Sequence, residues 1–256
     1  MSEKQAVREW TNHGLTSHLR RQASWLRDSY LWLLDTKILP DYLTKGKRPR
    51  ALDVGCGPGY IMDIMAEQMD VVGLDLDPDM VAMCQARGLD VRQGDAHKLP
   101  FKDGEFDVVY CSYLLLFVPQ PGQALEEMAR VSRNLVVCLG EPDFGARIDY
   151  PEELARLTEL VVKGLEASGG DPHIARKLRE LFHRADLQSE MGIHPGVWEL
   201  KRLWEEFVEE WRWAVRTAGK EANVEELEGL KKVWEKGLRD GTLFQYMPVF
   251  WCVGRK

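Results

Sequence analysis

The order of apolar runs between Arg50 and Glu141 limits most strongly what this chain can fold into. Short runs rich in Val, Leu and Tyr alternate there with stretches that carry helical spacing. The predicted strands are RALDV at 50–54, DVVGLDL at 70–76, LDVRQGD at 89–95, FDVVYCSYLLL at 106–116 and NLVVCLGEP at 134–142. Strands that alternate with helices at this pace predict a parallel sheet with right-handed crossovers, and therefore an α/β fold.

The regions on either side of this core have a different, mainly helical pattern. Residues 5–45 carry apolar side chains at helical spacing, and after Glu141 helical stripes dominate again, interrupted by a strand expected near 187–193. PVFWCVGRK closes the chain as a last strand. We therefore expect three parts, which are an N-terminal helical arm at 1–45, a core of 46–145 with 246–256, and a helical substrate-cover region at 146–245.

The segment LDVGCGPGY at 52–60 follows the first predicted strand and places glycines at 55, 57 and 59. Glycine backbone in a strand-to-helix turn can approach a ligand closely, and the N-terminus of the following helix favours polar groups. The dinucleotide fingerprint GxGxxG needs a glycine where Tyr60 stands, and no Lys-Ser or Lys-Thr pair of a phosphate-binding loop follows. A nicotinamide dehydrogenase and a P-loop enzyme are therefore disfavoured, whereas a purely structural turn stays possible on these residues alone.

Three aspartates at the ends of three consecutive strands narrow the choice of ligand. Asp53 would repel a pyrophosphate and favours a cationic ligand without phosphate. Asp75 can accept hydrogen bonds from both hydroxyls of a ribose. Asp95 can accept from an adenine amino group, while the backbone N–H of Ala96 meets the ring nitrogen. S-adenosylmethionine carries an ammonium and a sulfonium and fits this set, so we predict it as the cofactor, with S-adenosylhomocysteine as its product.

Residues 50–140 resemble the class I S-adenosylmethionine-dependent methyltransferases, and most of all the ubiquinone- and menaquinone-biosynthesis type. The matching pieces are LDVGCGPGY, VVGLDLDPDMV, GDAHKLPFKDGEFDVVYCSYLLLFV and VFWCVGRK. The resemblance implies a Rossmann-like three-layer sandwich around a mostly parallel seven-stranded sheet whose last strand is antiparallel. It also implies cofactor contacts at Asp53, Gly55, Gly57, Asp75, Asp95 and Cys111. Neighbouring positions complete the predicted cofactor set, namely Cys56 (through its backbone), Gly59, Tyr60, Leu76, Met80, Gly94 and Ala96.

Two features depart from that family. VSRNLVVC stands where members carry a Pro-Gly-Gly turn before the fifth strand, which changes a turn remote from the cofactor. Residues 142–245 have no counterpart in the minimal fold, and we expect them to cover the substrate.

A second group of polar residues follows the fifth strand, in GEPDFGARIDYP. It faces the crevice in which open parallel sheets bind their ligands. The predicted substrate contacts are Glu141, Asp143, Arg147 and Tyr150, with Glu141 as the first candidate for a catalytic base. The alternative is that these residues and the neighbouring Asp149 cap the helix that begins at Pro151 and pair with one another.

Two helical segments carry further candidates. His18 on the N-terminal arm is a second candidate base, because histidine titrates near neutral pH, although a solvated helix face is the favoured interpretation of this residue. The Trp-rich segment 197–215 is interpreted as a core helix that could also cap an apolar substrate. Its Glu-Glu pairs at 205–206 and 209–210 are interpreted as a solvated face.

Charge and cysteine usage limit the partners. The net charge of −7 argues against a nucleic-acid partner, which usually needs a basic face. The five cysteines are scattered without a CxxC pair, and we predict neither disulfides nor a metal site. No apolar run approaches 18 residues and the first residues are charged, so we expect a cytoplasmic protein with no membrane contact.

Together these features predict an enzyme, a methyltransferase that methylates a small molecule by in-line displacement. The segment YCSYLL lacks the acid-proline context of RNA cytosine methyltransferases and the Asn/Asp-Pro-Pro-aromatic turn of enzymes that methylate amino groups of adenine or glutamine. Two alternatives stay open. One is a methyltransferase that acts on a protein or RNA group, and the other is a non-catalytic regulatory protein that binds S-adenosylmethionine. The oligomeric state and the methylated atom are not predicted.

Overall fold

The computed structural model describes residues 3–43, 46 and 48–256, with only the backbone of residues 3–14 and 43. Its main sheet has seven strands, which are β1 (Arg50–Val54), β2 (Asp70–Asp75), β3 (Val91–Gln93), β4 (Phe106–Ser112), β5 (Ser132–Pro142), β7 (Gln188–Ile193) and β9 (Val249–Arg255). Their order is β3-β2-β1-β4-β5-β9-β7. The first five strands are parallel, and β9 runs antiparallel to both of its neighbours. The predicted sheet with an antiparallel last strand is confirmed, and the strand expected near 187–193 is β7.

The helices begin and end at the signals that the sequence provides. They are α1 (Glu3–Leu33), the π-helix η1 (Leu34–Ile38), α2 (Pro40–Leu43), α3 (Tyr60–Met65), α4 (Pro78–Ala86), α5 (Pro121–Val131), α6 (Ala155–Ala167), α7 (Leu178–Arg184), α8 (Leu200–Ala218) and α9 (Val224–Asp240). Asp77 caps α4 by accepting a 2.8 Å hydrogen bond from the backbone N–H of Asp79, and Pro78 opens the helix. Within the described residues, no helix combines the length and apolarity needed to cross a bilayer.

The main sheet is covered on both faces, which explains why its strands are apolar almost throughout. Along β5, Leu135 and Val137 pack with the apolar side of α1, including Tyr30. The alternate residues Val136 and Cys138 pack with α5, α6 and α7. The fold is therefore a three-layer sandwich, and α1 is part of its core.

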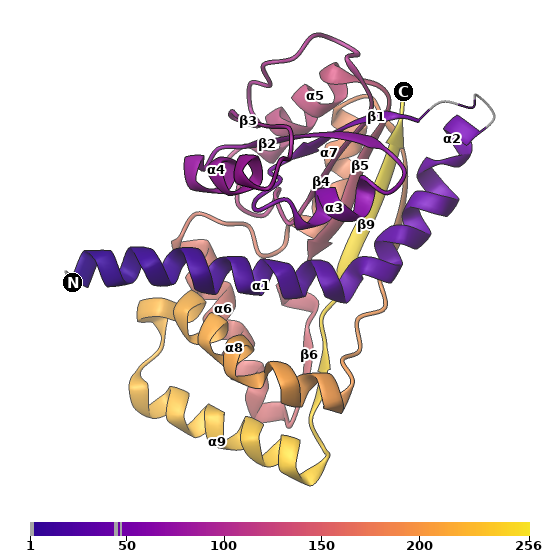
Figure 1. Ribbon diagram of the computed structural model, residues 1–256. Coiled ribbons are helices and arrows are strands. Elements are labelled where there is room, and N and C mark those ends of the chain that lie inside the picture. Colours follow the sequence, from indigo (N-terminus) through magenta and orange to yellow (C-terminus); the bar gives the residue numbers. More distant parts are fainter. Residues whose placement is uncertain (1–2, 44–45, 47) are drawn as a thin grey trace.

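The long helix α1 also separates the two halves of the molecule (Figure 1). The sheet with α3 and α4 lies on one side of it, and α8 and α9 lie on the other. In the second half α6 and α8 cross so closely that a Cβ on Gly164 would overlap the carbonyl oxygen of Thr217. Glycine therefore permits this close crossing.

A small second sheet joins β6 (Ile148–Tyr150) to β8 (Phe244–Tyr246) in antiparallel register. The sequence analysis did not predict it. Each strand has three residues, and the partners lie almost a hundred positions apart, so neither shows a readable alternation. This sheet brings the two ends of the helical region together.

Candidate functional site

The turn of residues 55–60, called the glycine turn below, joins β1 to α3, and Gly55 and Gly57 are half-buried in it. All three glycines have positive φ, at +73° for Gly55, +50° for Gly57 and +79° for Gly59. The backbone N–H groups of Gly55 and Cys56 both donate to the Leu74 carbonyl oxygen, at 2.8 and 3.1 Å. A Cβ on Gly55 would lie 2.6 Å from Cδ1 of Leu114. Both the backbone angles and the available space therefore favour glycine here.

Asp53 stands at the end of β1, directly before this turn. Its side chain is buried, with 3% of the residue exposed. No well-aligned hydrogen bond reaches its Oδ2 from the described residues, although the buried hydroxyl of Tyr110 interacts with this carboxyl and opposes the rise of its pKa. Burial raises the pKa of this carboxyl well above its usual range. A buried carboxylate oxygen without a partner is costly, and a bound cation would satisfy it.

Asp75 connects the glycine turn to the end of β2. Its Oδ2 accepts from the backbone N–H of Gly57 at 2.7 Å, and its Oδ1 accepts from the backbone N–H of Asp77 at 2.9 Å. Burial raises the pKa of Asp75, although these hydrogen bonds oppose the shift. Each carboxylate oxygen can accept more than one hydrogen bond, so Asp75 retains capacity for ligand hydroxyls.

Asp95 lies beyond β3, at the third strand end. Its Oδ1 accepts from the backbone N–H of His97 at 2.9 Å and lies 2.7 Å from Nδ1 of the same residue. These contacts, the backbone one first, lower the pKa of Asp95. Its exposed side chain is therefore an ionised acceptor at neutral pH.

The other predicted cofactor positions lie around these three acids. Leu76 is 66% exposed directly after β2, an unusual position for a large apolar side chain. Met80 and Ala96 are buried. The backbone N–H of Gly94 donates to the Asp75 carbonyl oxygen at 2.9 Å, which ties the end of β3 to β2. The acids, the glycine turn and an exposed apolar residue thus gather at the carboxyl ends of β1, β2 and β3.

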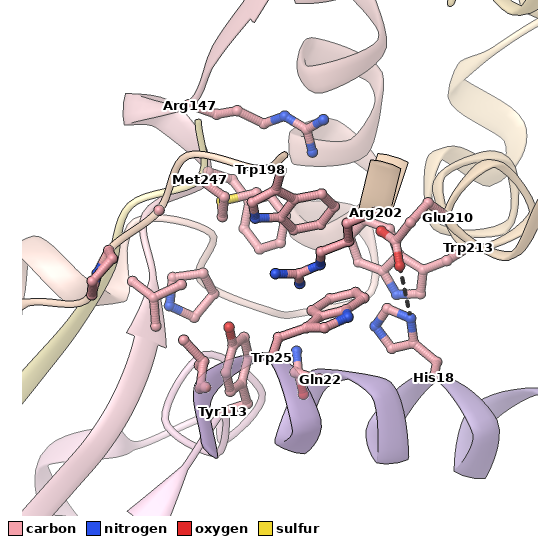
Figure 2. Close-up of a pocket in the computed structure, with 16 residues that line it drawn as sticks. His18, Gln22, Trp25, Tyr113, Arg147, Trp198, Arg202, Glu210, Trp213 and Met247 are labelled. Atoms are coloured by element: carbon pink, nitrogen blue, oxygen red, sulfur yellow. Dashed lines mark ion pairs between the residues drawn. The ribbon is translucent and has the colours of Figure 1, made fainter. Parts of the chain in front are cut away.

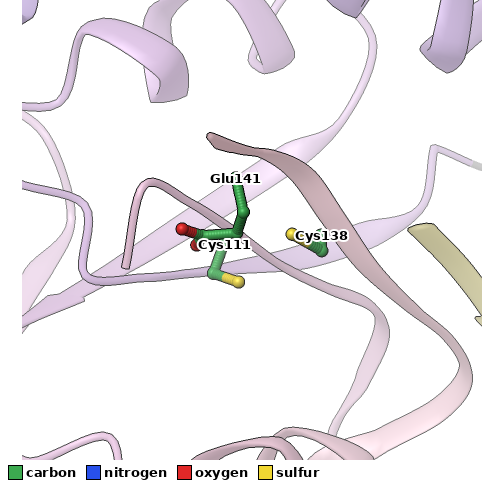
Figure 3. Close-up of side chains that lie close together, drawn as sticks. All are labelled: Cys111, Cys138 and Glu141. Carbon is green, nitrogen blue, oxygen red and sulfur yellow. The ribbon is translucent and has the colours of Figure 1, made fainter. Parts of the chain in front are cut away.

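Cys111 lies farther inside the sheet, next to Cys138 and Glu141 (Figure 3). The two cysteines face each other in register on β4 and β5. The sulfur and carboxylate atoms of the three side chains lie within 4.8 Å of one another, and this is the group among the described residues that could hold a metal ion by proximity. Burial raises the pKa of the Cys138 thiol well above its usual range, so the thiol is protonated.

Glu141 has no exposed surface. Its Oε1 accepts from the backbone N–H groups of Leu114 and Leu115, both at 2.8 Å, and no described group bonds to its Oε2. Burial raises the pKa of Glu141 to about 7, and the backbone donors oppose this shift. The carboxyl therefore holds the turn after β4 against β5, and its role as a base stays a prediction.

The remaining predicted substrate residues are not brought together at one point. Asp143 accepts a bidentate pair from Arg176, at 2.7 Å from both Nε and Nη2. Burial opposes ionisation of Asp143, but the Arg176 pair outweighs it and the pKa is lowered. Tyr150 is 53% exposed on β6.

Arg147 forms the pairing that the alternative interpretation anticipated. Its Nε lies 2.9 and 3.0 Å from the two carboxylate oxygens of Asp149. Asp149 also accepts from Thr158 at 2.7 Å and from Gln245 at 2.9 Å, so it belongs to a connected network. Arg147 nevertheless lines the pocket that follows.

A pocket lies between α1, α8 and the segments that follow β4 and β5; it is called the α1–α8 pocket below (Figure 2). Its cavity volume is about 60 Å³. Many of its wall residues are aromatic or charged. The lining comprises His18, Gln22, Trp25, Leu26, Tyr113, Pro142, Phe144, Arg147, Pro195, Gly196, Trp198, Arg202, Glu210, Trp213, Met247 and Val249. Of the predicted substrate and catalytic residues, His18 and Arg147 are in this wall.

His18 is held on the pocket wall by two contacts. Its ring stacks on Trp213, with ring centroids 5.5 Å apart and planes 2° from parallel. Its Nδ1 lies 3.5 Å from Oε1 of Glu210. Glu210 is buried, with 6% exposed, so the interpretation of the Glu-Glu pair at 209–210 as a solvated face is wrong. The missed signal was the spacing of Arg202, Glu206 and Glu210, four residues apart along one stripe of α8.

The pocket and the glycine turn are neighbours. Tyr113 lines the pocket with a positive φ of 52°, and the next residue, Leu114, contacts the position that a Gly55 Cβ would occupy. On α1, Leu19 lies 3.8 Å from the position of a Gly57 Cβ, between pocket residues His18 and Gln22. This arrangement can hold one ligand at the strand ends and a second ligand beside it.

Comparison with known proteins agrees with this geometry. Residues 52–138 match the family model described as a methyltransferase domain. The demethylmenaquinone methyltransferase of Renibacterium salmoninarum is 40% identical over 115 residues, covering 42% of this chain and 48% of the relative. The phosphatidylethanolamine N-methyltransferase of Cereibacter sphaeroides is 36% identical over 93 residues, covering 33% and 46%. The chain thus spans less than half the length of these two curated relatives.

A solved structure supports the fold over a longer region. The crystal structure of a SAM-dependent methyltransferase from Archaeoglobus fulgidus has a TM-score of 0.52 at 18% identity, and the match covers 89% of this chain and 99% of that one. S-adenosylmethionine is the cofactor of this class of domain. The chain therefore carries, over residues 52–138, a methyltransferase domain of the class I S-adenosylmethionine-dependent superfamily, similar to that of the menaquinone-biosynthesis enzymes.

Proposed function

We propose that the chain is a methyltransferase that methylates a small-molecule acceptor bound in the α1–α8 pocket. The observation that carries this proposal is the buried Asp53 carboxyl, whose Oδ2 has no well-aligned hydrogen bond from the described residues, beside the glycine turn and next to an aromatic pocket. Relatives named for demethylmenaquinone and phosphatidylethanolamine support a small-molecule acceptor rather than a protein or an RNA.

The residues at the strand ends fit the parts of S-adenosylmethionine. Asp53 would accept from its ammonium group, and Asp75 would accept from its ribose hydroxyls. The exposed side chain of Leu76 would pack against the adenine ring. Asp95 and the backbone N–H of Ala96 would bind the edge of that ring.

When bound, S-adenosylmethionine supplies a methyl carbon on a positively charged sulfur, which is open to in-line displacement. The chain itself has to align the acceptor and exclude water. Trp25 and Trp213 line the pocket and provide an apolar wall for both tasks. His18 is placed to take a proton from an acceptor, and Glu210 at 3.5 Å orients its ring.

Calorimetry with S-adenosylmethionine and S-adenosylhomocysteine tests the cofactor part. The wild-type chain should bind both, and Asp75→Ala should weaken binding by about 2 kcal/mol, as expected for lost bonds to a carboxylate. Asp75→Asn should have a smaller effect, because it keeps an acceptor oxygen for the amide of Gly57. Asp70→Ala is the matched control, since Asp70 lies at the opposite end of β2 with an exposed carboxylate paired to Arg48.

Two results would contradict the proposal. One is the absence of binding heat with either ligand while NADH binds. The other is an equal loss of affinity in Asp70→Ala and Asp75→Ala, which would indicate a general effect on β2.

A further inference from the structure

We propose that the α1–α8 pocket recognises its acceptor through a carboxylate group, which the guanidinium of Arg202 binds. This inference rests on the proposed function and specifies the chemical class of its substrate. It makes Arg202 a determinant of acceptor specificity.

Arg202 extends from α8 into the pocket wall (Figure 2). Its guanidinium carbon lies 4.2 Å from the ring centroid of Trp25 and 4.7 Å from that of Trp198. Contact with the faces of two indole rings holds a planar cation in one orientation. The side chain is therefore prearranged before any ligand arrives.

Two donor nitrogens of this guanidinium are not used by the part of the chain that the structure describes. Its Nε and Nη2 are buried and have no hydrogen-bond acceptor among residues 3–43, 46 and 48–256. Within the same part of the chain, no carboxylate lies within ion-pair distance of Arg202. A buried cation with unpaired donors is costly unless a ligand supplies the missing acceptors.

The nearest acidic side chains on the same helix have other partners. Glu206 accepts from the indole N–H of Trp25 at 3.1 Å and lies 2.8 Å from Nε of Arg21. Glu210 faces His18. Burial lowers the pKa of Arg202, and the through-space attraction of Glu206 and Glu210 opposes this shift. Neither acid occupies the hydrogen-bonding face of the guanidinium, which is left for a ligand.

The same geometry distinguishes an anionic acceptor from an amine. Groups of aromatic rings commonly bind cationic ligands, and Trp25 and Trp198 could do so. Arg202 already occupies the faces of both rings, so an ammonium would meet a like charge. A carboxylate instead matches the guanidinium in shape and charge, and pairs with it through two parallel hydrogen bonds.

Probe binding tests this inference. Benzoate, benzamide, benzylamine and phenyl phosphate share one ring and differ in charge. Each would be titrated into the chain saturated with S-adenosylhomocysteine, with calorimetry and tryptophan fluorescence as readouts. Benzoate should bind about tenfold or more tighter than benzamide and benzylamine, as expected for a charge-assisted pair.

The decisive variant is Arg202→Met, which keeps the length and apolar bulk of the side chain. It should remove the preference for benzoate over benzamide and leave S-adenosylhomocysteine binding unchanged. Arg212→Met on the same helix is the control, because Arg212 is exposed and pairs with Glu209. It should retain the preference.

Several outcomes would overturn the assignment. They are benzoate binding no tighter than benzamide, unchanged benzoate affinity in Arg202→Met, or tighter binding of benzylamine. Phenyl phosphate binding about tenfold tighter than benzoate would replace the carboxylate with a phosphate. Failure to bind S-adenosylhomocysteine would instead count against the proposed function, and the same titrations measure that separately.

Discussion

The glycine turn and the α1–α8 pocket are neighbours, but different parts of the chain build them. The turn uses backbone from one short segment, and its acids Asp53 and Asp75 lie within a few residues of strand ends. The pocket uses side chains from α1, from the ends of β4 and β5, and from α8, which are up to two hundred positions apart. A site made of local backbone leaves a readable pattern in sequence, whereas a site made of distant side chains does not.

We expect the largest effect on stability at Glu141, whose carboxyl binds the backbone N–H groups of Leu114 and Leu115 in the turn after β4. This turn borders both the glycine turn and the α1–α8 pocket. Its pKa of about 7 in the folded chain lies above its ordinary value of 4.5. As pH rises from 4.5 towards 7, the unfolded chain loses this proton while the folded chain keeps it, so the free energy of unfolding falls. The loss should approach about 3 kcal/mol and be complete above the folded pKa.

Urea unfolding of wild type and Glu141→Gln at several pH values measures this effect. The variant keeps an acceptor for Leu114 and Leu115 but cannot ionise, so the difference between the two chains should change across this window and be constant outside it. A constant difference from pH 4.5 to 8 would show that Glu141 does not titrate there. If Glu141 is also the catalytic base, the variant should lose turnover while retaining ligand affinity.

The next largest effect is expected at Asp53, where one substitution should change ligand affinity and stability in opposite directions. Asp53→Asn removes the charge that we assign to the cofactor ammonium, so affinity for S-adenosylmethionine should fall roughly thirtyfold, or about 2 kcal/mol. Burial raises the pKa of Asp53, which means that ionisation costs the folded chain stability. The variant should therefore unfold at higher urea concentration than wild type at neutral pH. Loss of both affinity and stability would indicate a structural role for the carboxylate.

A smaller effect should appear in the pocket when one ring beside Arg202 is removed. Trp25→Ala deletes one of the two ring faces and the hydrogen bond to Glu206. Benzoate affinity should fall by about 1 kcal/mol, with S-adenosylhomocysteine affinity unchanged. Trp204→Ala on the exposed side of α8 is the control and should change neither affinity. Equal losses for both ligands would mean that the two regions are not independent.

The smallest effect should come from Tyr150, which the sequence placed with the substrate and the structure places on an exposed strand. Tyr150→Phe should change affinity for either ligand, and stability, by less than about 0.5 kcal/mol. A larger loss of turnover would place its hydroxyl against the acceptor and restore the original prediction.

The elements that sequence could predict are those whose signals are local. Gly55 and Gly57 have positive φ, and the strand RALDV is buried on both faces. Both properties can be predicted from a few neighbouring residues in the sequence. Glu210 was misread because a carboxylate on a charged helix usually faces solvent. Only the packing of α8 against α1, which brings His18 beside it, explains its burial.

The proposed role of Arg202 in binding a carboxylate could not be predicted from the sequence for the same reason. Its two neighbouring rings come from positions 25 and 198, and nothing in either segment points to the other. The two-stranded sheet of β6 and β8 was missed because three-residue strands carry too little alternation.

The position of α1 couples the surroundings of the two ligand sites. From Leu26 to Leu33 its inward side chains are locked into the sheet, whereas Leu15 is exposed and Leu19 rests over the glycine turn. The carboxyl-terminal part of α1 is thus fixed in the core, while its middle part borders both the glycine turn and the α1–α8 pocket. A substitution that shifts the stretch from His18 to Gln22 would therefore alter the surroundings of donor and acceptor together.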